Sequence, residues 1–321
     1  MNGPSRPRVV FMGTPEFALP ALEAVARIAD VVRVVTRPDR PAGRGRVPTE
    51  SPVARRATEL GLDVLKAEAP NSTATREALA TFGPDLFVVV AFGAILSPEL
   101  LRIPRLGCIN LHGSLLPQYR GASPVQSALW DGCPGTGVTT LWMDEGIDTG
   151  DCILQRWTPI EASDDAASLG DKLARLGGPL LAESVLLAHA GRAPRRPQPR
   201  EGSYARKLRK RDGLISWGQD AVTVWNRQRA VTPWPGATTL SGGRRLIVTR
   251  AWPHHRLSAD APPGTVLAIE DTRVAVACSP GVLLLERVRP ESKNEMAAGE
   301  WARGARIAPG ERLTTPEEIP A

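Results

Sequence analysis

The feature that most constrains the fold is a series of short apolar runs, each the length of one buried strand, separated by segments with helical periodicity. The runs are RVVFM (8–12), VVRVVT (31–36), 63–66, LFVVVA (86–91) and GCINL (107–111). Strands that alternate with helices form a parallel sheet covered on both faces, and wholly apolar runs such as LFVVVA suit the buried centre of that sheet. We therefore predict an α/β, Rossmann-like first domain over residues 1–190.

The pattern changes near residue 190. Residues 189–211 contain nine basic residues, one acidic residue and three prolines, a composition typical of a segment that runs over a surface. Short β-like runs separated by Gly and Pro clusters follow. They are RLIVTR (245–250), TVLAI (265–269), RVAVAC (273–278) and VLLLERV (282–288). We predict a basic linker over 191–211 and a smaller antiparallel β-barrel or sandwich over 212–321.

Composition and cysteine usage exclude several classes. A chain of 321 residues has room for two cores, and no apolar run is long enough to cross a bilayer. The first residues, MNGPSRPRVVFMG, lack the apolar stretch of a secretory signal. The four cysteines stand far apart without a CxxC pair, which predicts reduced thiols in the cytoplasm. No Cys, His and carboxylate cluster has ligand spacing, so we expect no metal.

Basic charge is concentrated in one part of the chain. Residues 191–321 hold 22 Lys and Arg against 13 Asp and Glu, whereas residues 1–190 hold 18 against 21. A polyanion is the obvious partner for such a surface. Solubility in an arginine-rich chain would produce the same asymmetry, so charge alone leaves both interpretations open.

Two polar residues stand at the end of the run GCINLH. Asn110 and His112 are two apart on a predicted strand, so their side chains leave the same face. Ligands of open α/β sheets bind at the carboxyl ends of the strands. A carboxamide donor beside an imidazole fits acyl transfer, in which a carbonyl oxygen gains charge while a nitrogen loses a proton. A turn-capping asparagine and a hydrogen-bonded core histidine would look the same, and the pair alone favours that structural role.

The segment DEGIDTGD (144–151) favours a catalytic role for Asn110 and His112 over a structural one. Three Asp and one Glu fall within eight residues that also contain two glycines. The glycines let the backbone approach a ligand, and one carboxylate can orient His112. A calcium loop is the rival interpretation, but the spacing does not match the alternating ligands of an EF-hand.

Together these motifs resemble the formyltransferase family that uses 10-formyltetrahydrofolate. Its shared signature is an Asn-x-His strand, a SLLP turn and a downstream Asp, found here as Asn110, His112, residues 114–117 and Asp148. The resemblance implies that Asn110 polarises the formyl oxygen and that His112 manages charge and protons at the attacking amine. Asp148 would position His112 and a water. The resemblance also implies that the folate site is lined by Ser114, Leu115, Leu116 and Pro117.

Members of this family differ in the amine that accepts the formyl group. Three features resemble the members that act on initiator methionyl-tRNA: the opening VVFMGTPEFALPALEAV (9–25), the insertion TRPDRPAGRGRVPTESPV (36–53), and a basic linker followed by an OB-like β-domain. The resemblance implies that tRNA is bound by Arg44, Lys207, Arg209 and Lys210. Arg-rich loops also occur as plain surface segments. Trp217, Trp225 and Trp234 could stack on bases, but tryptophan more often packs a core.

The leading hypothesis is a cytoplasmic, monomeric enzyme that formylates the α-amine of initiator methionyl-tRNA for translation initiation, using 10-formyltetrahydrofolate as co-substrate. The main alternative is another folate-dependent formyltransferase, or a formyl-folate hydrolase, on the same fold. A third hypothesis is an RNA-binding protein without activity. The presence of Asn110, His112 and Asp148 argues against the third.

Overall fold

The computed structural model describes residues 6–42, 47–254 and 260–315. The chain divides into two compact units. The first unit comprises Met1–Pro124, Gly135–Pro159 and Gly170–Ala205. The second unit comprises Val125–Pro134, Ile160–Leu169 and Arg206–Ala321. Two short segments that precede residue 190 in sequence thus belong to the second unit.

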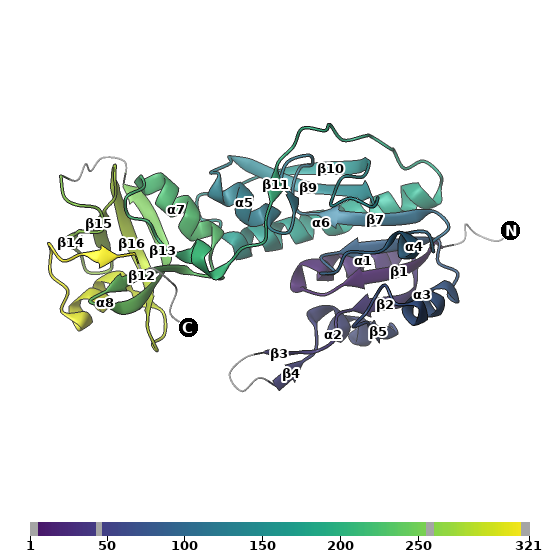
Figure 1. Cartoon of the computed structure of the whole chain (residues 1–321), viewed down its shortest axis with the longest axis horizontal. Coiled ribbons are helices and arrows are strands. Elements are labelled where there is room, and N and C mark those ends of the chain that lie inside the picture. Colours follow the sequence, from purple (N-terminus) through teal and green to yellow (C-terminus); the bar gives the residue numbers. More distant parts are fainter. Residues whose placement is uncertain (1–5, 43–46, 255–259, 316–321) are drawn as a thin grey trace. The chain divides into compact units, whose positions relative to one another are not determined.

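A seven-stranded sheet forms the centre of the first unit (Figure 1). Its strands, in spatial order, are β10 (Cys152–Pro159), β9 (Gly135–Trp142), β7 (Gly107–His112), β6 (Leu86–Val90), β1 (Arg8–Gly13), β2 (Asp30–Thr36) and β5 (Val64–Lys66). The five strands from β7 to β5 run parallel, which confirms the predicted α/β class. Strands β9 and β10, which were not predicted from the sequence, extend the sheet as an antiparallel hairpin beyond β7.

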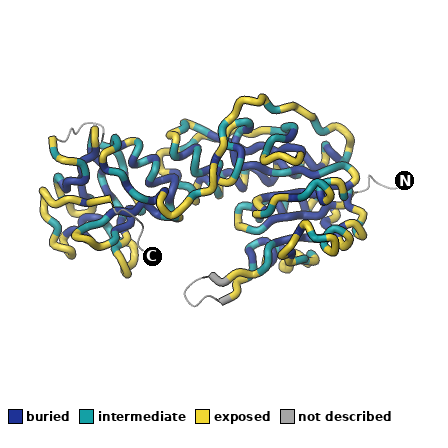
Figure 2. The backbone as a smooth tube through the Cα atoms, in the orientation of Figure 1, coloured by how far each residue is buried: buried dark blue, intermediate teal, exposed yellow. Residues whose placement is uncertain are grey.

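The middle of this sheet is buried (Figure 2), as its composition requires. Every residue of β6 is buried, and β1 is buried after its first residue. Helices accompany the strands, and the bounds of those in or reaching into this unit are η1 (Glu16–Ala18), α1 (Leu19–Ile28), α2 (Pro52–Glu59), α3 (Thr73–Ala80), α4 (Pro98–Leu101) and α6 (Ala166–His189). The Ser51 hydroxyl accepts a hydrogen bond from Ala54 N at 3.0 Å and Pro52 follows at the first helical position, so Ser51-Pro52 starts α2 as predicted.

Close packing of α6 fixes the strand that carries Asn110 and His112. A Cβ at Gly177 would lie 2.7 Å from a methyl carbon of Leu111, which is on β7. A Cβ at Gly178 would lie 2.7 Å from the carbonyl oxygen of Pro20 in α1. A side chain at either position would require its neighbour to shift, so these two glycines let α6 pack directly against β7 and α1.

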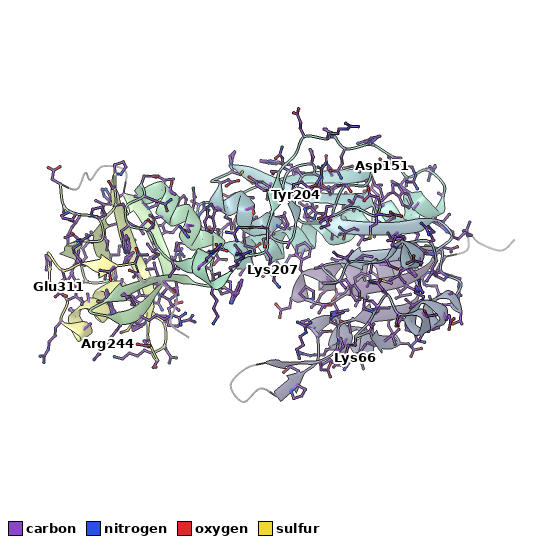
Figure 3. All side chains as sticks on the ribbon, viewed as in Figure 1. Lys66, Asp151, Tyr204, Lys207, Arg244 and Glu311 are labelled. Carbon is purple, nitrogen blue, oxygen red and sulfur yellow. The ribbon has the colours of Figure 1, made fainter. Side chains whose placement is uncertain are left out.

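The insertion after β2 is more regular than the loop expected from its composition. Its described parts pair as a short antiparallel ribbon of β3 (Arg40–Ala42) and β4 (Val47–Thr49). Lys66, labelled in Figure 3, binds Asp39 at 2.9 Å and Glu50 at 3.0 Å. Asp39 directly precedes β3, and Glu50 directly follows β4. Hydrogen bonds to these carboxylates raise the pKa of Lys66. Arg44 lies outside the described residues.

The second unit is built on an antiparallel sheet, which confirms the predicted β-rich C-terminal domain. Its strands, in spatial order, are β14 (Val266–Ile269), β15 (Val274–Ala277), β16 (Val282–Pro290), β13 (Arg244–His254), β12 (Ala237–Ser241) and β18 (Leu313–Thr314), with β17 (Met296–Ala297) paired to β16. All these pairs are antiparallel. The helices in this unit are α5 (Pro124–Trp130), η2 (Lys210–Gly213), α7 (Ala221–Ala230) and α8 (Ala298–Ala305).

The three tryptophans considered for base stacking have different surroundings. Trp217 is 3% exposed within the core of the second unit and donates a hydrogen bond to Thr239 Oγ1 at 3.0 Å. Trp225 packs against the same core and lies 6.2 Å, between ring centroids, from Trp252. Trp234 is 54% exposed. Burial therefore accounts for Trp217 and Trp225, and leaves Trp234 accessible.

The cysteines are all free, as the sequence predicts. Burial raises the pKa of the Cys108 and Cys278 thiols to about 12, so neither is ionised near neutral pH. The described part of the chain contains no cluster of three or more His, Cys, Asp or Glu that could hold a metal ion. None of the helices it describes has the length and apolar character needed to span a membrane.

These environments predict unequal effects of two tryptophan substitutions. Trp217→Ala should lower the free energy of unfolding of the second unit by about 3–5 kcal/mol, because it leaves a cavity in the core. Trp234→Ala should change it by about 0.5 kcal/mol or less. Urea unfolding of the full chain, followed by circular dichroism, measures both. Equal losses for the two variants would contradict the assignment of Trp217 to the core.

Candidate active site

Strand β7 brings the first two site residues to the carboxyl edge of the sheet. It lies between β6 and β9, with His112 opposite Thr139 of β9. Because side chains two apart share a face of a strand, Asn110 and His112 emerge together, as predicted. Asn110 is half-buried and His112 is 5% exposed. Burial on a central strand gives both side chains a fixed direction.

Asp148 meets both of them from the loop between β9 and β10. Its Oδ1 accepts a hydrogen bond from Asn110 Nδ2 at 3.2 Å, and its Oδ2 lies 3.4 Å from His112 Nδ1. Oδ2 also accepts from the backbone N–H of Gly121 at 2.8 Å. The structure therefore brings together the three residues singled out in the sequence, and one carboxylate joins them.

The acidic loop is shaped by another of its own carboxylates. Asp144 accepts hydrogen bonds from Gly146 N at 3.0 Å and from Thr149 Oγ1 at 2.8 Å. Asp148 itself has φ +54°, in the left-handed region that non-glycine residues rarely adopt. A residue held in that region marks a position where surrounding contacts outweigh the local preference. At Asp148 these contacts include the hydrogen bonds that its carboxylate accepts from Asn110 Nδ2 and Gly121 N, which direct it toward β7.

The other ring nitrogen of His112 is also engaged. Nε2 lies 2.8 Å from the carbonyl oxygen of Tyr119. A carbonyl only accepts, so Nε2 carries the hydrogen in this contact. Tyr119 has φ +60° and its N–H donates to Ser203 Oγ at 2.8 Å. The ring is thus held between a backbone carbonyl on one side and Asp148 on the other.

The predicted folate turn, residues 114–117, is anchored through its backbone. Thr139 Oγ1 donates to the carbonyl of Ser114 at 2.7 Å and accepts from Leu116 N at 3.1 Å. Gln155 Nε2 donates to the carbonyl of Leu116 at 2.8 Å. Ser114 and Leu116 are buried, whereas Leu115 and Pro117 are half-buried. The side chains of the latter two are therefore partly accessible.

Several supporting residues were missed by sequence reasoning, and each lies in a segment without an obvious signal. Tyr119 and Gly121 contribute backbone groups, which any residue carries. Thr139 and Gln155 lie on the hairpin that was not predicted. Gln198 lies in the basic linker, yet its Nε2 donates to the carbonyls of Asp148 at 2.9 Å and Gly150 at 2.7 Å.

Three of the four basic residues expected to bind tRNA lie in the part of the chain that the structure describes. Lys207, Arg209 and Lys210 belong to the second unit, and all three are exposed. Arg206, next to them, instead binds Asp212 through two contacts of 2.7 Å. That ion pair and the adjacent 3-10 helix η2 fix the backbone at the start of the second unit. The side chains of Lys207, Arg209 and Lys210 face solvent there.

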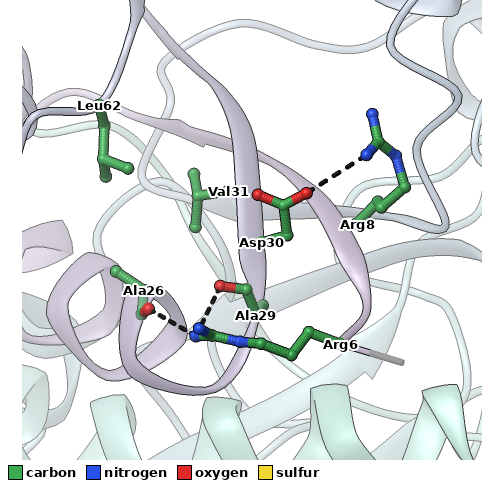
Figure 4. A pocket seen from close by; sticks show the side chains of 7 residues that line it. All are labelled: Arg6, Arg8, Ala26, Ala29, Asp30, Val31 and Leu62. Atoms are coloured by element: carbon green, nitrogen blue, oxygen red, sulfur yellow. Dashed lines mark hydrogen bonds and ion pairs between the residues drawn. The ribbon is translucent and has the colours of Figure 1, made fainter. Parts of the chain in front are cut away.

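A surface hollow of about 560 Å³ lies at the opposite end of the parallel strands (Figure 4). Its lining includes Arg8 and Asp30, the first residues of β1 and β2. Arg6 donates to the carbonyls of Ala26 and Ala29, and Arg8 binds Asp30 at 3.3 Å. These cations are already engaged in ending α1 and tying two strands together.

An amide, an imidazole and a carboxylate are in contact at the carboxyl edge of the sheet, and these groups suit acyl-group transfer. Family models agree. Residues 8–185 match the model "Formyl transferase", and residues 207–306 match "Formyl transferase, C-terminal domain". The chain belongs to the formyl transferase family.

Curated relatives cover almost the whole chain. It is 43% identical over 307 residues to a methionyl-tRNA formyltransferase of Myxococcus xanthus, covering 95% of this chain and 97% of the relative. It is 44% identical over 313 residues to a methionyl-tRNA formyltransferase of Symbiobacterium thermophilum, covering 97% and 96%. The similarity therefore includes both units and the segment that connects them.

Solved structures share the fold at lower identity. WlaRD, a sugar 3N-formyl transferase crystallised in the presence of dTDP and 5-N-formyl-THF, gives a TM-score of 0.67 at 15% identity, covering 91% of this chain and 100% of that one. HypX from Aquifex aeolicus, in complex with tetrahydrofolic acid, gives 0.62 at 20% identity, covering 93% and 47%. These likenesses support the fold of both units.

Gly121 offers a test of the backbone contact to Asp148. Its φ is +105°, and an added Cβ would lie 2.7 Å from the carbonyl oxygen of Ala205. Gly121→Ala must therefore shift the N–H that binds Asp148, and should reduce formyl transfer by about ten- to a hundred-fold. Activity and melting temperature of the full chain measure the effect.

Gly83→Ala is the matched control for strain without displacement. Gly83 also has positive φ, at +54°, but no heavy atom lies within 4 Å of an added Cβ. This variant should lose stability, by about 1 kcal/mol, and keep its activity. If Gly121→Ala loses no more activity than Gly83→Ala, the Gly121 contact does not hold Asp148.

Proposed function

We propose that the enzyme transfers the formyl group of 10-formyltetrahydrofolate to the α-amino group of methionine carried by initiator tRNA. The observation that carries the proposal is the single Asp148 carboxylate that joins Asn110 and His112. The identity of 43% to a curated methionyl-tRNA formyltransferase, over 95% of this chain, supports this acceptor.

The residues take the following roles in this proposal. The amine nitrogen attacks the formyl carbon and forms a bond to it, and the bond from that carbon to the folate nitrogen breaks. Overall, one proton passes from the amine to the departing folate nitrogen. Asn110 has two N–H groups and gives one to Asp148, so the second is available to the carbonyl oxygen as it gains charge. His112 exchanges protons with the amine and stabilises the positive charge on it. Asp148 holds the His112 ring and a water molecule in position.

The folate would lie along residues 114–117. Leu115 and Pro117 are the half-buried members of this turn, and Thr139 fixes its backbone at two points. A turn anchored in this way presents a rigid apolar edge, which lowers the ordering cost of binding. Structural relatives crystallised with tetrahydrofolic acid or 5-N-formyl-THF support a folate ligand on this fold.

The RNA would be held by phosphate contacts to Lys207, Arg209 and Lys210, with Arg44 acting from the insertion after β2. The exposure of the first three and the net basic charge of residues 191–321 support this assignment. The proposal includes the domain limits 1–190, 191–211 and 212–321. It also includes a monomer in the cytoplasm that needs no metal.

A second candidate function is formylation of a different amine. WlaRD is a sugar formyl transferase whose likeness covers 91% of this chain, so the C-terminal β-domain alone does not choose the acceptor. Incubation with 10-formyltetrahydrofolate and either charged or uncharged initiator tRNA separates the two functions. Formyl on the methionyl-tRNA supports the proposal, whereas folate turnover that is independent of tRNA would overturn it in favour of the second candidate.

The catalytic assignment predicts large losses from small substitutions. Asn110→Ala should lower kcat by about 10²–10³, the usual cost of one donor to a developing oxyanion. His112→Ala should lower it similarly, and Asp148→Ala should match them because it aims both partners. Each variant should keep its far-UV circular dichroism spectrum. Near-normal turnover in either the Asn110 or the His112 variant would reject the site.

The phosphate contacts predict a change in salt dependence. Replacing Lys207, Arg209 and Lys210 by alanine should weaken tRNA binding and reduce the slope of log affinity against log salt by up to about one unit per lost phosphate contact. Replacing Arg55, Arg175 and Arg192, three exposed cations of the first unit, by alanine is the charge-matched control and should change the slope less. Filter binding between low and physiological salt measures both. An unchanged slope in the triple variant would show that these cations do not contact phosphate.

A further inference from the structure

One glutamine of the basic linker has surroundings unlike those of its neighbours. Gln198 is half-buried, whereas residues 195–197 and 199–200 are exposed. Its side-chain amide reaches the acidic loop, where Nε2 donates to the carbonyls of Asp148 at 2.9 Å and Gly150 at 2.7 Å. A linker residue therefore contacts the backbone of the residue whose carboxylate joins Asn110 and His112.

Arg120 determines which way this amide faces. Gln198 Oε1 accepts from Arg120 Nε at 3.1 Å and from Arg120 Nη2 at 2.9 Å. A guanidinium only donates and a backbone carbonyl only accepts, so the oxygen must face Arg120 and the nitrogen must face the loop. Arg120 is 4% exposed, and burial strengthens hydrogen bonds to its charge.

The segment is also fixed on both sides of Gln198. Arg196 and Cys152 exchange two backbone hydrogen bonds, of 2.9 and 3.1 Å, on one side. On the other side, Ser203 Oγ accepts from Tyr119 N, and β11 (Tyr204–Ala205) pairs with β8 (Arg120–Gly121). These contacts fix the position of Gln198 relative to the acidic loop. Two donated hydrogen bonds from a fixed amide can stabilise a backbone conformation that Asp148 would not adopt unaided.

We propose that Gln198 is a positioning residue, which holds Asp148 in its left-handed conformation so that its carboxylate meets Asn110 and His112. The proposal rests on the function assigned to Asp148 above. Gln198 touches no reacting atom; it acts through the carbonyls of Asp148 and Gly150. Its loss should therefore lower kcat and leave the binding of both substrates nearly unchanged.

Two substitutions separate this role from simple anchoring of the linker. Gln198→Ala removes both links, to Arg120 and to the loop. Gln198→Glu keeps acceptors for Arg120, and strengthens that link with a charge, but replaces the donor with an oxygen that repels the two carbonyls. If Gln198 only anchors the linker, the glutamate should preserve activity. If it positions Asp148, the glutamate should fail like the alanine.

The experiment measures formylation of initiator methionyl-tRNA by the full chain at saturating 10-formyltetrahydrofolate. We expect kcat to fall about ten- to a hundred-fold in both variants, with KM values within about two-fold of wild type. The melting temperature should fall in both variants, and it should fall less in Gln198→Glu, which keeps the link to Arg120. Glu201→Ala, an exposed residue of the same segment, should match wild type throughout.

Wild-type kcat in Gln198→Glu, or a rise of KM without a fall of kcat, would overturn the positioning role. Asp148→Ala, measured in the same series, keeps the two proposals distinct. If Asp148→Ala is impaired while Gln198→Glu is fully active, only the role of Gln198 fails. If Asp148→Ala is itself fully active, the assignment of the site fails.

Discussion

The arrangement of the site depends on the carboxylate of Asp148. Its two oxygens face an amide N–H from Asn110, a ring nitrogen of His112 and the backbone N–H of Gly121. Asn110 and His112 lie on a central strand, and Gly121 lies in the segment that follows it. The carboxylate therefore fixes that segment relative to the strand. A carboxylate is suited to this because it offers several acceptor positions and a charge. No neutral side chain could satisfy three such neighbours equally well.

How much of this the sequence predicts depends on the kind of interaction. Asn110 and His112 could be paired in advance because strand periodicity places residues two apart on one face. The contact of Asp148 with them spans 36 residues or more of chain. The composition of 144–151 predicted a carboxylate beside His112, and the family resemblance identified it as Asp148. The backbone partners, the Tyr119 carbonyl and the Gly121 N–H, have no side-chain signature at all. Gln198 was hidden because the composition around it is that of a linker.

The fold shows the same division. Wholly apolar runs predicted the parallel strands because burial on both faces leaves a strong signal. The hairpin of β9 and β10 was missed, since GVTTLW mixes polar and apolar residues and gives no clean period, although β9 is almost entirely buried. Its threonines are used: Thr139 holds the 114–117 turn and Thr140 bonds Ser184 in α6 at 2.7 Å. Buried hydroxyls with partners look like surface residues in a sequence.

The contacts of His112 also constrain its chemistry. Nε2 faces the Tyr119 carbonyl and Nδ1 faces Asp148, and both neighbours present acceptor oxygens. With its hydrogen on Nε2, the neutral imidazole directs the lone pair of Nδ1 toward Asp148 Oδ2. Both ring nitrogens are therefore engaged within the protein itself. To take a proton from the amine, the ring must first release one of these two contacts, and the substrate is the natural replacement.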